Sequence, residues 1–161
     1  RAEPPTLPEQ HFIGHLQTNK IPDMLEFASM LHSLDRLKTA GKLNSALEQR
    51  DSHLPVLIQV NTSGEDSKFG VAPAEVQRLV DAVEELPRLE LQGFMTIGLF
   101  SDDREAVRLS YRRLWEVRRQ SEQQLGRALP ELSMGMSGDY PLAIAEGATI
   151  VRLGSIVFGS R

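Results

Sequence analysis

The sequence of 161 residues contains no cysteine, which excludes disulfide bonds and thiolate metal sites and gives no sign of an oxidising compartment. It has no apolar run near the ~18 residues of a membrane span, so we expect no membrane partner. With 18 basic and 22 acidic residues, the net charge of −4 disfavours a nucleic-acid-binding protein. Because neither a signal peptide nor a transit peptide is visible, we expect a cytoplasmic protein.

Lysine is also scarce, since only Lys20, Lys38, Lys42 and Lys68 stand among the 18 basic residues. The apolar fraction of 40% and the charged fraction of 25% are those of an ordinary globular domain. Residues 1–10, which contain three prolines, predict a loop or residual linker, and residues 11–161 predict one domain. The first residue is not methionine, so we expect the translated protein to begin earlier.

Hydrophobic patterning predicts about six strand–helix units along the chain. Strands are expected at 11–14, 31–34, 55–61, 89–97, 132–136 and 149–153. Helices are expected at 21–31, from a cap at Asp35 to residue 49, at 72–86, 102–125 and 140–146, with a last short element at 156–159. Strands linked by helical crossovers pair in parallel, which leaves two α/β architectures open. These are a doubly wound open sheet and a (β/α) barrel that has lost two units.

The loops after the last two predicted strands have the composition of an anion site. The segments LSMGMSGD (132–139) and TIVRLGS (149–155) each run from a strand into glycine and serine. Glycine lets the backbone approach an anion, and Ser137 and Ser155 add hydroxyl donors. Barrels often bind phosphate after their last two strands, so phosphate binding and simple turn chemistry with capping serines remain equally open.

Arg152 lies in an otherwise apolar strand, between Val151 and Leu153. Buried arginine is rare unless it is paired. Arg152 therefore either faces a polar ligand, reaches the sheet edge or meets a structural carboxylate.

A serine hydrolase is not expected. The segment GMSGD around Ser137 resembles a nucleophile elbow, but Asp139 replaces the last glycine and no histidine follows it in the chain. A metal site is not expected either, because His11 and His15 flank Gly14 outside any helix. We interpret the histidines as hydrogen-bonded or surface residues.

Arginine recurs every four residues in the long helix, at Arg104, Arg108 and Arg112. The spacing predicts a solvated helix face whose arginines pair with acids such as Glu105 and Glu116. A surface for an anion or a protein partner is the alternative interpretation.

Six segments, in order, carry a resemblance to a known family: HFIGHLQTNK (11–20), HSLD (32–35), VLIQVNTSGEDSKFG (56–70), GFMTI (93–97), LSMGMS (132–137) and VRLGSIVFG (151–159). Together they closely resemble the pyridoxal 5′-phosphate homeostasis proteins. The resemblance implies a (β/α)8 TIM barrel of the alanine-racemase N-terminal-domain type. Residues 11–161 would supply strands three to eight, with the first two β-α units absent from this chain.

The resemblance also implies a cofactor site for pyridoxal 5′-phosphate at the barrel mouth. Ser137, Gly154 and Ser155 match the family's phosphate-binding positions, and Arg152 matches the arginine near the pyridine nitrogen. Ile13 and Met95 match positions that flank the ring. In the family a lysine of the first strand forms a Schiff base with the aldehyde, and none of the four lysines here corresponds to it.

The function implied is a non-catalytic carrier that buffers vitamin B6 and amino-acid pools. A cationic arginine disfavours the protonated ring nitrogen that makes the cofactor a strong electron sink. Expected partners are pyridoxal phosphate and apo forms of the enzymes that use it. The alternatives are an amino-acid racemase, for which only Tyr111 and Tyr140 could serve as the tyrosine acid/base, and a protein-interaction module using the arginine-rich helix.

Overall fold

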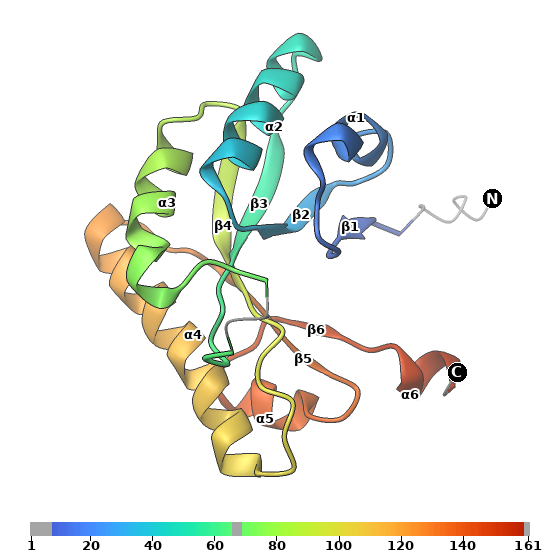
Figure 1. Ribbon diagram of the computed structural model, residues 1–161, viewed down its shortest axis with the longest axis vertical. Helices are drawn as coiled ribbons and strands as arrows, with labels where there is room; N and C mark the ends of the chain where they lie inside the picture. The colour runs from blue at the N-terminus through green and yellow to red at the C-terminus, as the bar shows by residue number, and fades with distance from the viewer. Residues whose placement is uncertain (1–7, 66–68, 160–161) are drawn as a thin grey trace, which may run out of the picture.

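The computed structural model describes residues 8–65 and 69–159, in which strands and helices alternate (Figure 1). The strands are β1 (His11–Phe12), β2 (Met30–Leu34), β3 (Leu54–Gln59), β4 (Leu89–Met95), β5 (Glu131–Met136) and β6 (Ile150–Arg152). The α-helices are α1 (Ile21–Met24), α2 (Leu37–Gln49), α3 (Val76–Glu84), α4 (Arg104–Leu125), α5 (Tyr140–Ala145) and α6 (Ser155–Phe158). Two 3-10 turns are η1 (Thr18–Lys20) and η2 (Pro73–Glu75). Most of the predicted 1–10 loop, and Lys68, lie outside the described residues.

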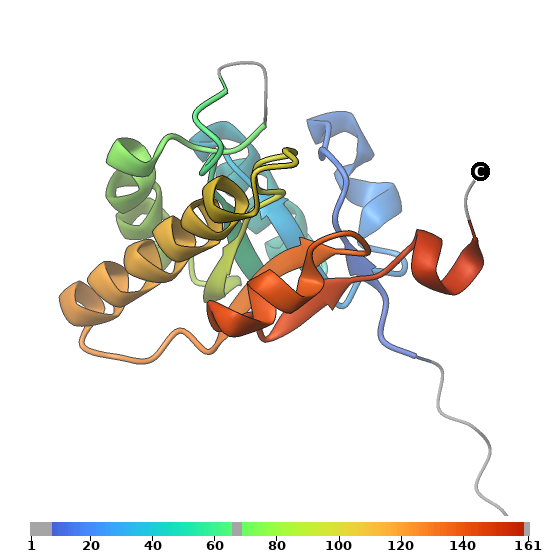
Figure 2. The same cartoon turned by 90° about the horizontal axis from the view of Figure 1, so that it is seen from below.

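The six strands form one parallel sheet in the order β1-β2-β3-β4-β5-β6. The sheet is curled, and α2, α3 and α4 follow its outer side (Figure 1, Figure 2). In a barrel, strands that are consecutive in sequence lie side by side and the helices cover only the outer side, whereas a doubly wound sheet carries helices on both faces. The sheet is therefore a half-barrel. Because the strands are parallel, the carboxyl ends of all six lie at the same end of the sheet. Ligands bind at that end in folds of this kind.

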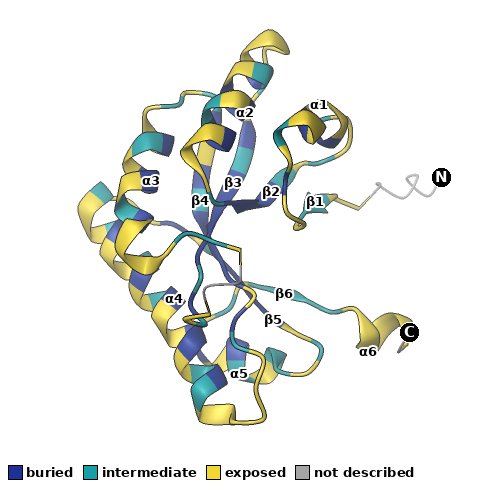
Figure 3. Cartoon of the chain, in the orientation of Figure 1, coloured by how far each residue is buried: buried dark blue, intermediate teal, exposed yellow. Residues whose placement is uncertain are grey.

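The core lies between the sheet and the helices on its outer side (Figure 3). Val80 and Val83 of α3 are fully buried, as are Ile58 of β3 and Phe94 of β4. Each such side chain stabilises the fold by about 1.5–3 kcal/mol relative to its exposed state. No helix in the described part of the chain is long and apolar enough to cross a bilayer.

The long helix α4 begins and ends as its sequence indicates. The Asp103 carboxylate accepts from the backbone N–H groups of Glu105 (3.0 Å) and Ala106 (3.2 Å), which caps the positive end of the helix. Gly126, with φ 66°, terminates it in the left-handed conformation that glycine adopts without strain. The predicted acidic start of this helix is confirmed.

Two sequence predictions near the amino-terminal end are wrong. The helix expected over 21–31 stops at Met24, because the Ser29 N–H donates to the Gln10 carbonyl over 2.8 Å and draws the chain into β2 beside β1. We expected Asp35 to cap α2, but the N-cap residue is Arg36, and no side chain caps the first turn of the helix. The Asp35 carboxylate accepts from Arg36 Nε instead (3.2 Å).

Candidate functional site

A cavity of about 630 Å³ lies at the carboxyl ends of β5 and β6. It is lined by Ile13, Met136, Ser137, Gly138, Arg152, Leu153, Gly154 and Ser155. Five of the six predicted site residues are thus brought together, from the end of β1, from β6 and from the loops after β5 and β6. The sixth, Met95, is 1% exposed in β4 and is not among the residues that line this cavity.

The Ser137 hydroxyl joins the two loops. Its oxygen accepts from the backbone N–H of Gly154 (3.1 Å) and from that of Ile156 (3.3 Å). With both amides donating to the oxygen, the hydroxyl hydrogen is free to be donated to a ligand. A Cβ built at Gly154 meets no atom within 4 Å, so the space beside this backbone is open. The free hydroxyl hydrogen, with open space beside the glycine backbone, is suited to an oxyanion.

Arg152 is held by neutral acceptors. Its Nη1 donates to Ser133 Oγ (2.7 Å), and its Nη2 donates to the Thr96 carbonyl (2.7 Å). None of the described carboxylates forms an ion pair with it. Burial lowers the pKa of the guanidinium, which nevertheless stays protonated as arginine does in proteins. Of the interpretations open from the sequence, the structural carboxylate is therefore excluded, and the charge remains available to a polar ligand in the cavity.

A chain of hydrogen bonds runs from Arg152 to the edge strand β1. Since Ser133 Oγ accepts from Arg152, its hydrogen is available to His32 Nδ1, 2.9 Å away. We therefore infer the neutral His32 tautomer with the proton on Nε2, which donates to His11 Nδ1 over 3.0 Å. Burial, followed by the nearby His11 and Arg152, lowers the pKa of His32 to about 4. His32 is thus a neutral link that orients Ser133.

The interpretation of the histidines is confirmed for His11, His15 and His32, which all accept or donate hydrogen bonds. Among the described residues, no group of three His, Cys, Asp or Glu side chains is arranged to hold a metal ion.

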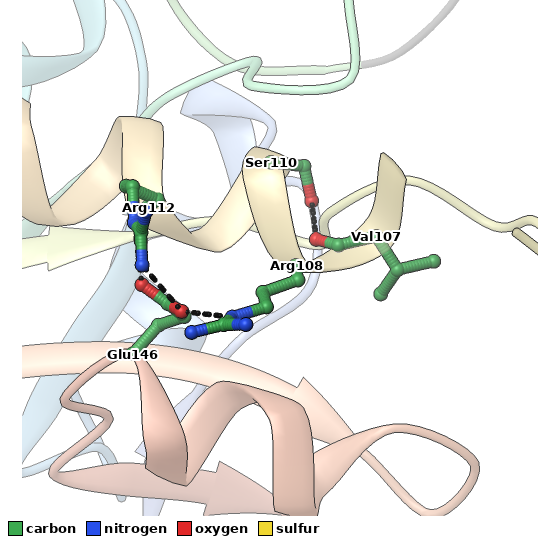
Figure 4. Close-up of polar contacts among 5 residues, drawn as sticks. All are labelled: Val107, Arg108, Ser110, Arg112 and Glu146. Atoms are coloured by element: carbon green, nitrogen blue, oxygen red, sulfur yellow. Dashed lines mark hydrogen bonds and ion pairs between the residues drawn. The ribbon is translucent and has the colours of Figure 1, made fainter. Parts of the chain in front are cut away.

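Arg104 and Arg112 lie on an exposed face of α4, as predicted, but the predicted pairing with acids of the same helix is wrong for Arg108 and Arg112. Arg108 Nε and Arg112 Nε donate to the two carboxylate oxygens of Glu146, at the end of α5 (Figure 4). Burial of Glu146 by itself raises the pKa of this carboxyl, but the two guanidinium groups outweigh that effect and lower it. A carboxylate that is 8% exposed requires such partners. The arginines therefore fix α5, which follows the Ser137 loop, against α4.

Sequence reasoning missed Ser133 and Thr96, which hold Arg152, and His32, which bonds to Ser133. A signal existed, since Ser133 and His32 are polar residues in the middle of apolar strands. Their pairing joins residues 101 positions apart, and no local pattern reports it. Met136, Gly138 and Leu153 also line the cavity without having been predicted.

Comparison with known proteins identifies the family to which the sequence is similar. The family model described as "Alanine racemase, N-terminal domain" matches residues 8–161. The chain is 42% identical over 153 residues to a protein of Aquifex aeolicus named pyridoxal phosphate homeostasis protein, covering 95% of this chain and 67% of the relative. A protein of the same name from Pseudomonas aeruginosa is 45% identical, with 94% of this chain and 64% of the relative covered. The chain thus spans about two thirds or less of the length of these relatives.

Solved structures agree in fold. The structure of PipY from Synechococcus elongatus with PLP bound superposes with a TM-score of 0.86 at 28% identity, covering 94% of this chain and 70% of that one. An alanine racemase from Clostridium difficile gives a TM-score of 0.75 at 18% identity, covering 97% of this chain and 41% of that one. The second likeness shows the fold alone.

Proposed function

The chain belongs to the pyridoxal phosphate homeostasis protein family, and on that premise we propose that it binds pyridoxal 5′-phosphate in the cavity at the ends of β5 and β6. The observation that carries the proposal is the meeting of two different groups in that cavity. Ser137 with the backbone amides is one, and the carboxylate-free Arg152 is the other. The cofactor has a phosphate at one end and a basic ring nitrogen at the other, so it requires both.

The phosphate would lie between the loops after β5 and β6. Ser137 would donate its hydroxyl hydrogen, Ser155 would donate its own, and the Gly154 backbone would lie beside the phosphate while its amide holds Ser137 Oγ. Ser155 lines the cavity and is exposed, as a ligand-binding group must be. The open space beside Gly154 fits a bulky oxyanion.

The pyridine ring would lie toward Arg152. The half-exposed Ile13 offers it an apolar surface across the cavity. Met95 is buried and would not touch the ring. Its neighbour Thr96 accepts a hydrogen bond from Arg152, so Met95 would affect the ring only by positioning that carbonyl.

The bound cofactor supplies an electron sink whose strength depends on protonation of the ring nitrogen. Arg152 is a permanent cation, so it opposes a proton at that nitrogen and weakens the sink. We therefore propose a carrier role, with apo forms of pyridoxal-phosphate enzymes as recipients, rather than transamination or racemisation. Neither Tyr111 nor Tyr140 lines the cavity, so no observation favours the racemase alternative.

We propose that the described part of this chain contributes only noncovalent contacts to the cofactor. Of the lysines in the described residues, Lys20, Lys38 and Lys42, none lines the cavity. Pyridoxine 5′-phosphate, which lacks the aldehyde, should then bind about as tightly as pyridoxal 5′-phosphate.

We also propose that the six strands correspond to strands three to eight of a (β/α)8 barrel, with residues 11–161 as one domain. Support comes from the curl of the parallel sheet, from its two outer strands β1 and β6, and from the greater length of the curated relatives. A cytoplasmic location stays a prediction.

Equilibrium dialysis of the 161-residue chain with both vitamers tests the proposal. We expect saturable binding of each, which Ser137→Ala weakens about tenfold through the loss of one charge-assisted hydrogen bond. Ser45→Ala, an exposed serine on α2, is the matched control and should leave affinity unchanged. Absence of binding, or equal weakening by both substitutions, would overturn the proposal. Binding of pyridoxal phosphate alone would instead show that a lysine captures the aldehyde.

A further inference from the structure

The phenol of Tyr111 is a buried polar group that has no part in the function proposed above. Tyr111 lies in α4 and is fully buried, and its hydroxyl has no hydrogen-bond partner among the described residues. Within that part of the chain, the one other buried side-chain atom in this state is Arg118 Nε. Buried hydroxyl groups are nearly always paired, since an unpaired one has lost its water without compensation. A new hydrogen bond from the Tyr111 hydroxyl would therefore be favourable.

The position of the Tyr111 ring is fixed by the loop that follows β4. Gly98 in this loop has φ 80°, and a Cβ built there would lie 2.8 Å from Tyr111 Cε1 and 3.2 Å from the hydroxyl oxygen. The backbone at Gly98 thus packs directly on the phenol, with no space for a side chain between them. Because the ring is held in this way, a partner for the hydroxyl has to come to it.

The carboxylate beside the hydroxyl belongs to Asp139, in the loop after β5. Burial, and after it the Asp139 carboxylate, raises the pKa of the Tyr111 phenol, which therefore stays protonated and can donate. The two groups are close enough to interact, although they do not form a hydrogen bond in this structure. A small displacement of Asp139 toward Tyr111 would complete that bond.

Asp139 determines the shape of the turn that carries Ser137. Its carboxylate accepts from the Met136 N–H (2.7 Å), and its own N–H donates to the Met136 carbonyl (3.0 Å). Ser137 lies between these two residues, and its oxygen accepts from the amides of Gly154 and Ile156. A change in the position of Asp139 therefore acts on the Ser137 hydroxyl through a single tight turn.

A phosphate bound at Ser137 would bring negative charge close to Asp139, which is two residues away in the same turn. Like charges repel each other, and the repulsion favours movement of the carboxylate away from the phosphate. A hydroxyl that donates to the carboxylate offsets part of the cost, since hydrogen bonds to ionised acceptors are among the strong ones. The unpartnered Tyr111 hydroxyl is placed to donate in this way.

We propose that Tyr111 is a positioning residue for phosphate binding, whose hydroxyl donates to the Asp139 carboxylate when the phosphate of a ligand binds at Ser137. The inference rests on the proposed function and deepens it, because it makes α4 part of the selection for phosphorylated ligands. The same helix holds the carboxyl-terminal end of α5 through its ion pairs with Glu146 (Figure 4). Helix α4 thus contacts both ends of this segment, and the contact at Tyr111 is the one that the ligand completes.

Tyr111→Phe removes the hydroxyl and keeps the ring. In equilibrium dialysis we expect it to weaken binding of pyridoxine 5′-phosphate about fivefold, and to change binding of pyridoxine, which lacks the phosphate, by less than about twofold. The urea midpoint of the free chain should stay the same or rise, because the hydroxyl has no hydrogen bond to lose there. Tyr140→Phe, at the other tyrosine of the chain, is the matched control and should change none of the three quantities.

Asp139→Asn tests whether Tyr111 acts through the carboxylate. The amide oxygen still accepts from Met136, but the charge that a phosphate would repel is gone. In this background Tyr111→Phe should weaken binding of pyridoxine 5′-phosphate by less than about twofold. A loss of about fivefold that persists in this background would overturn the assigned route through Asp139.

The hydrogen bond itself is observed by NMR. In Tyr140→Phe the only tyrosine is Tyr111, so a ¹³Cζ tyrosine label gives a single signal. Pyridoxine 5′-phosphate should move this signal toward the value of a phenol that donates a hydrogen bond, and pyridoxine should not. An unmoved signal, a lower urea midpoint in Tyr111→Phe, or the same effect of Tyr111→Phe on both ligands would overturn the inference and leave the proposed function intact. Absence of binding by the unsubstituted chain would overturn both.

Discussion

Arg152 Nη1 donates to Ser133 Oγ over 2.7 Å, so the partly buried guanidinium of the candidate site is anchored by a hydroxyl rather than by a carboxylate. The distinction has a chemical consequence. A carboxylate partner would cancel the charge, whereas a hydroxyl leaves it directed at whatever occupies the cavity. The bond to Ser133 thus holds Arg152 in place and leaves its positive charge uncompensated.

The first prediction concerns the ring nitrogen of the bound cofactor. With Arg152 facing it, ¹⁵N-labelled pyridoxine 5′-phosphate should show the chemical shift of an unprotonated pyridine at neutral pH, because a proton there would meet a fixed positive charge. Arg152→Gln removes that charge and should shift the resonance toward the protonated value. A protonated nitrogen in the unmodified chain would contradict the assigned role of Arg152.

The second prediction concerns Ser133. Ser133→Ala removes one partner from Arg152 Nη1 and one from His32 Nδ1, and both groups lie in the protein interior. We expect a loss of about 1–3 kcal/mol in the free energy of unfolding, measured in urea, because buried polar groups are left without partners. The exposed Ser45, which bonds only to the carbonyl of Gly41 in its own helix, is the control, and Ser45→Ala should cost less than about 0.5 kcal/mol. Similar costs for the two changes would mean that the buried chain of bonds does not form.

The third prediction concerns the pH dependence of stability through His32. Its pKa is about 4 in the folded chain against 6.5 for the ordinary side chain. The unfolded chain therefore binds more protons between these values, so the stabilisation is complete above pH 6.5 and is lost as the pH falls toward 4. Between about pH 7 and about pH 5, His32 should contribute a loss of about 2 kcal/mol.

Urea unfolding at the two pH values measures this contribution. His32→Gln should flatten the pH dependence, whereas the same change at the exposed His53 should not. An unchanged pH dependence in His32→Gln would show that His32 titrates normally in the folded state.

The fourth prediction concerns the contact between α4 and α5. Glu146→Gln removes the charge that accepts from Arg108 and Arg112, and we expect it to lower the free energy of unfolding by about 1–2 kcal/mol. The figure is modest because both guanidinium groups are about half exposed and water can replace part of the pairing. Since the pKa of Glu146 is lowered in the folded chain, its contribution is present above the ordinary value of 4.5 and is lost as the pH falls through the folded pKa.

Thermal unfolding with and without salt checks this prediction. The substitution should also reduce the sensitivity to salt, as removal of an ion pair does. Glu105→Gln, on the same helix, is the control and should have little effect on either quantity. Equal effects of the two changes would restore the interpretation of α4 as a solvated face.

The sequence predicted the six strands and the site loops because those features are local. An apolar run such as β3, or the acidic start of α4 at Asp103, reports its own structure through periodicity and capping. Ser137 and Ser155 were predicted as anion-site residues for the same reason, since each lies after a strand beside a glycine. The proximity of Ile13 to them came only from the family resemblance.

The features that the sequence did not predict depend on hydrogen bonds and ion pairs between residues that are distant in the chain. The start of β2 is set by the bond from Ser29 to Gln10, and helical spacing over 21–31 could not report it. Glu146 lies 34 residues from Arg112 and outcompetes the nearer acids because it is buried. The chain of bonds from Arg152 to His32 depends in the same way on strands that only the folded sheet aligns.

The measurement that tests the central claim most directly is the crystal structure of the chain with pyridoxine 5′-phosphate. We predict the phosphate within hydrogen-bond distance of Ser137 Oγ and Ser155 Oγ, with the ring nitrogen against Arg152. A ligand found only outside this cavity, or with its phosphate against Arg152 and its ring in solvent, would contradict the account.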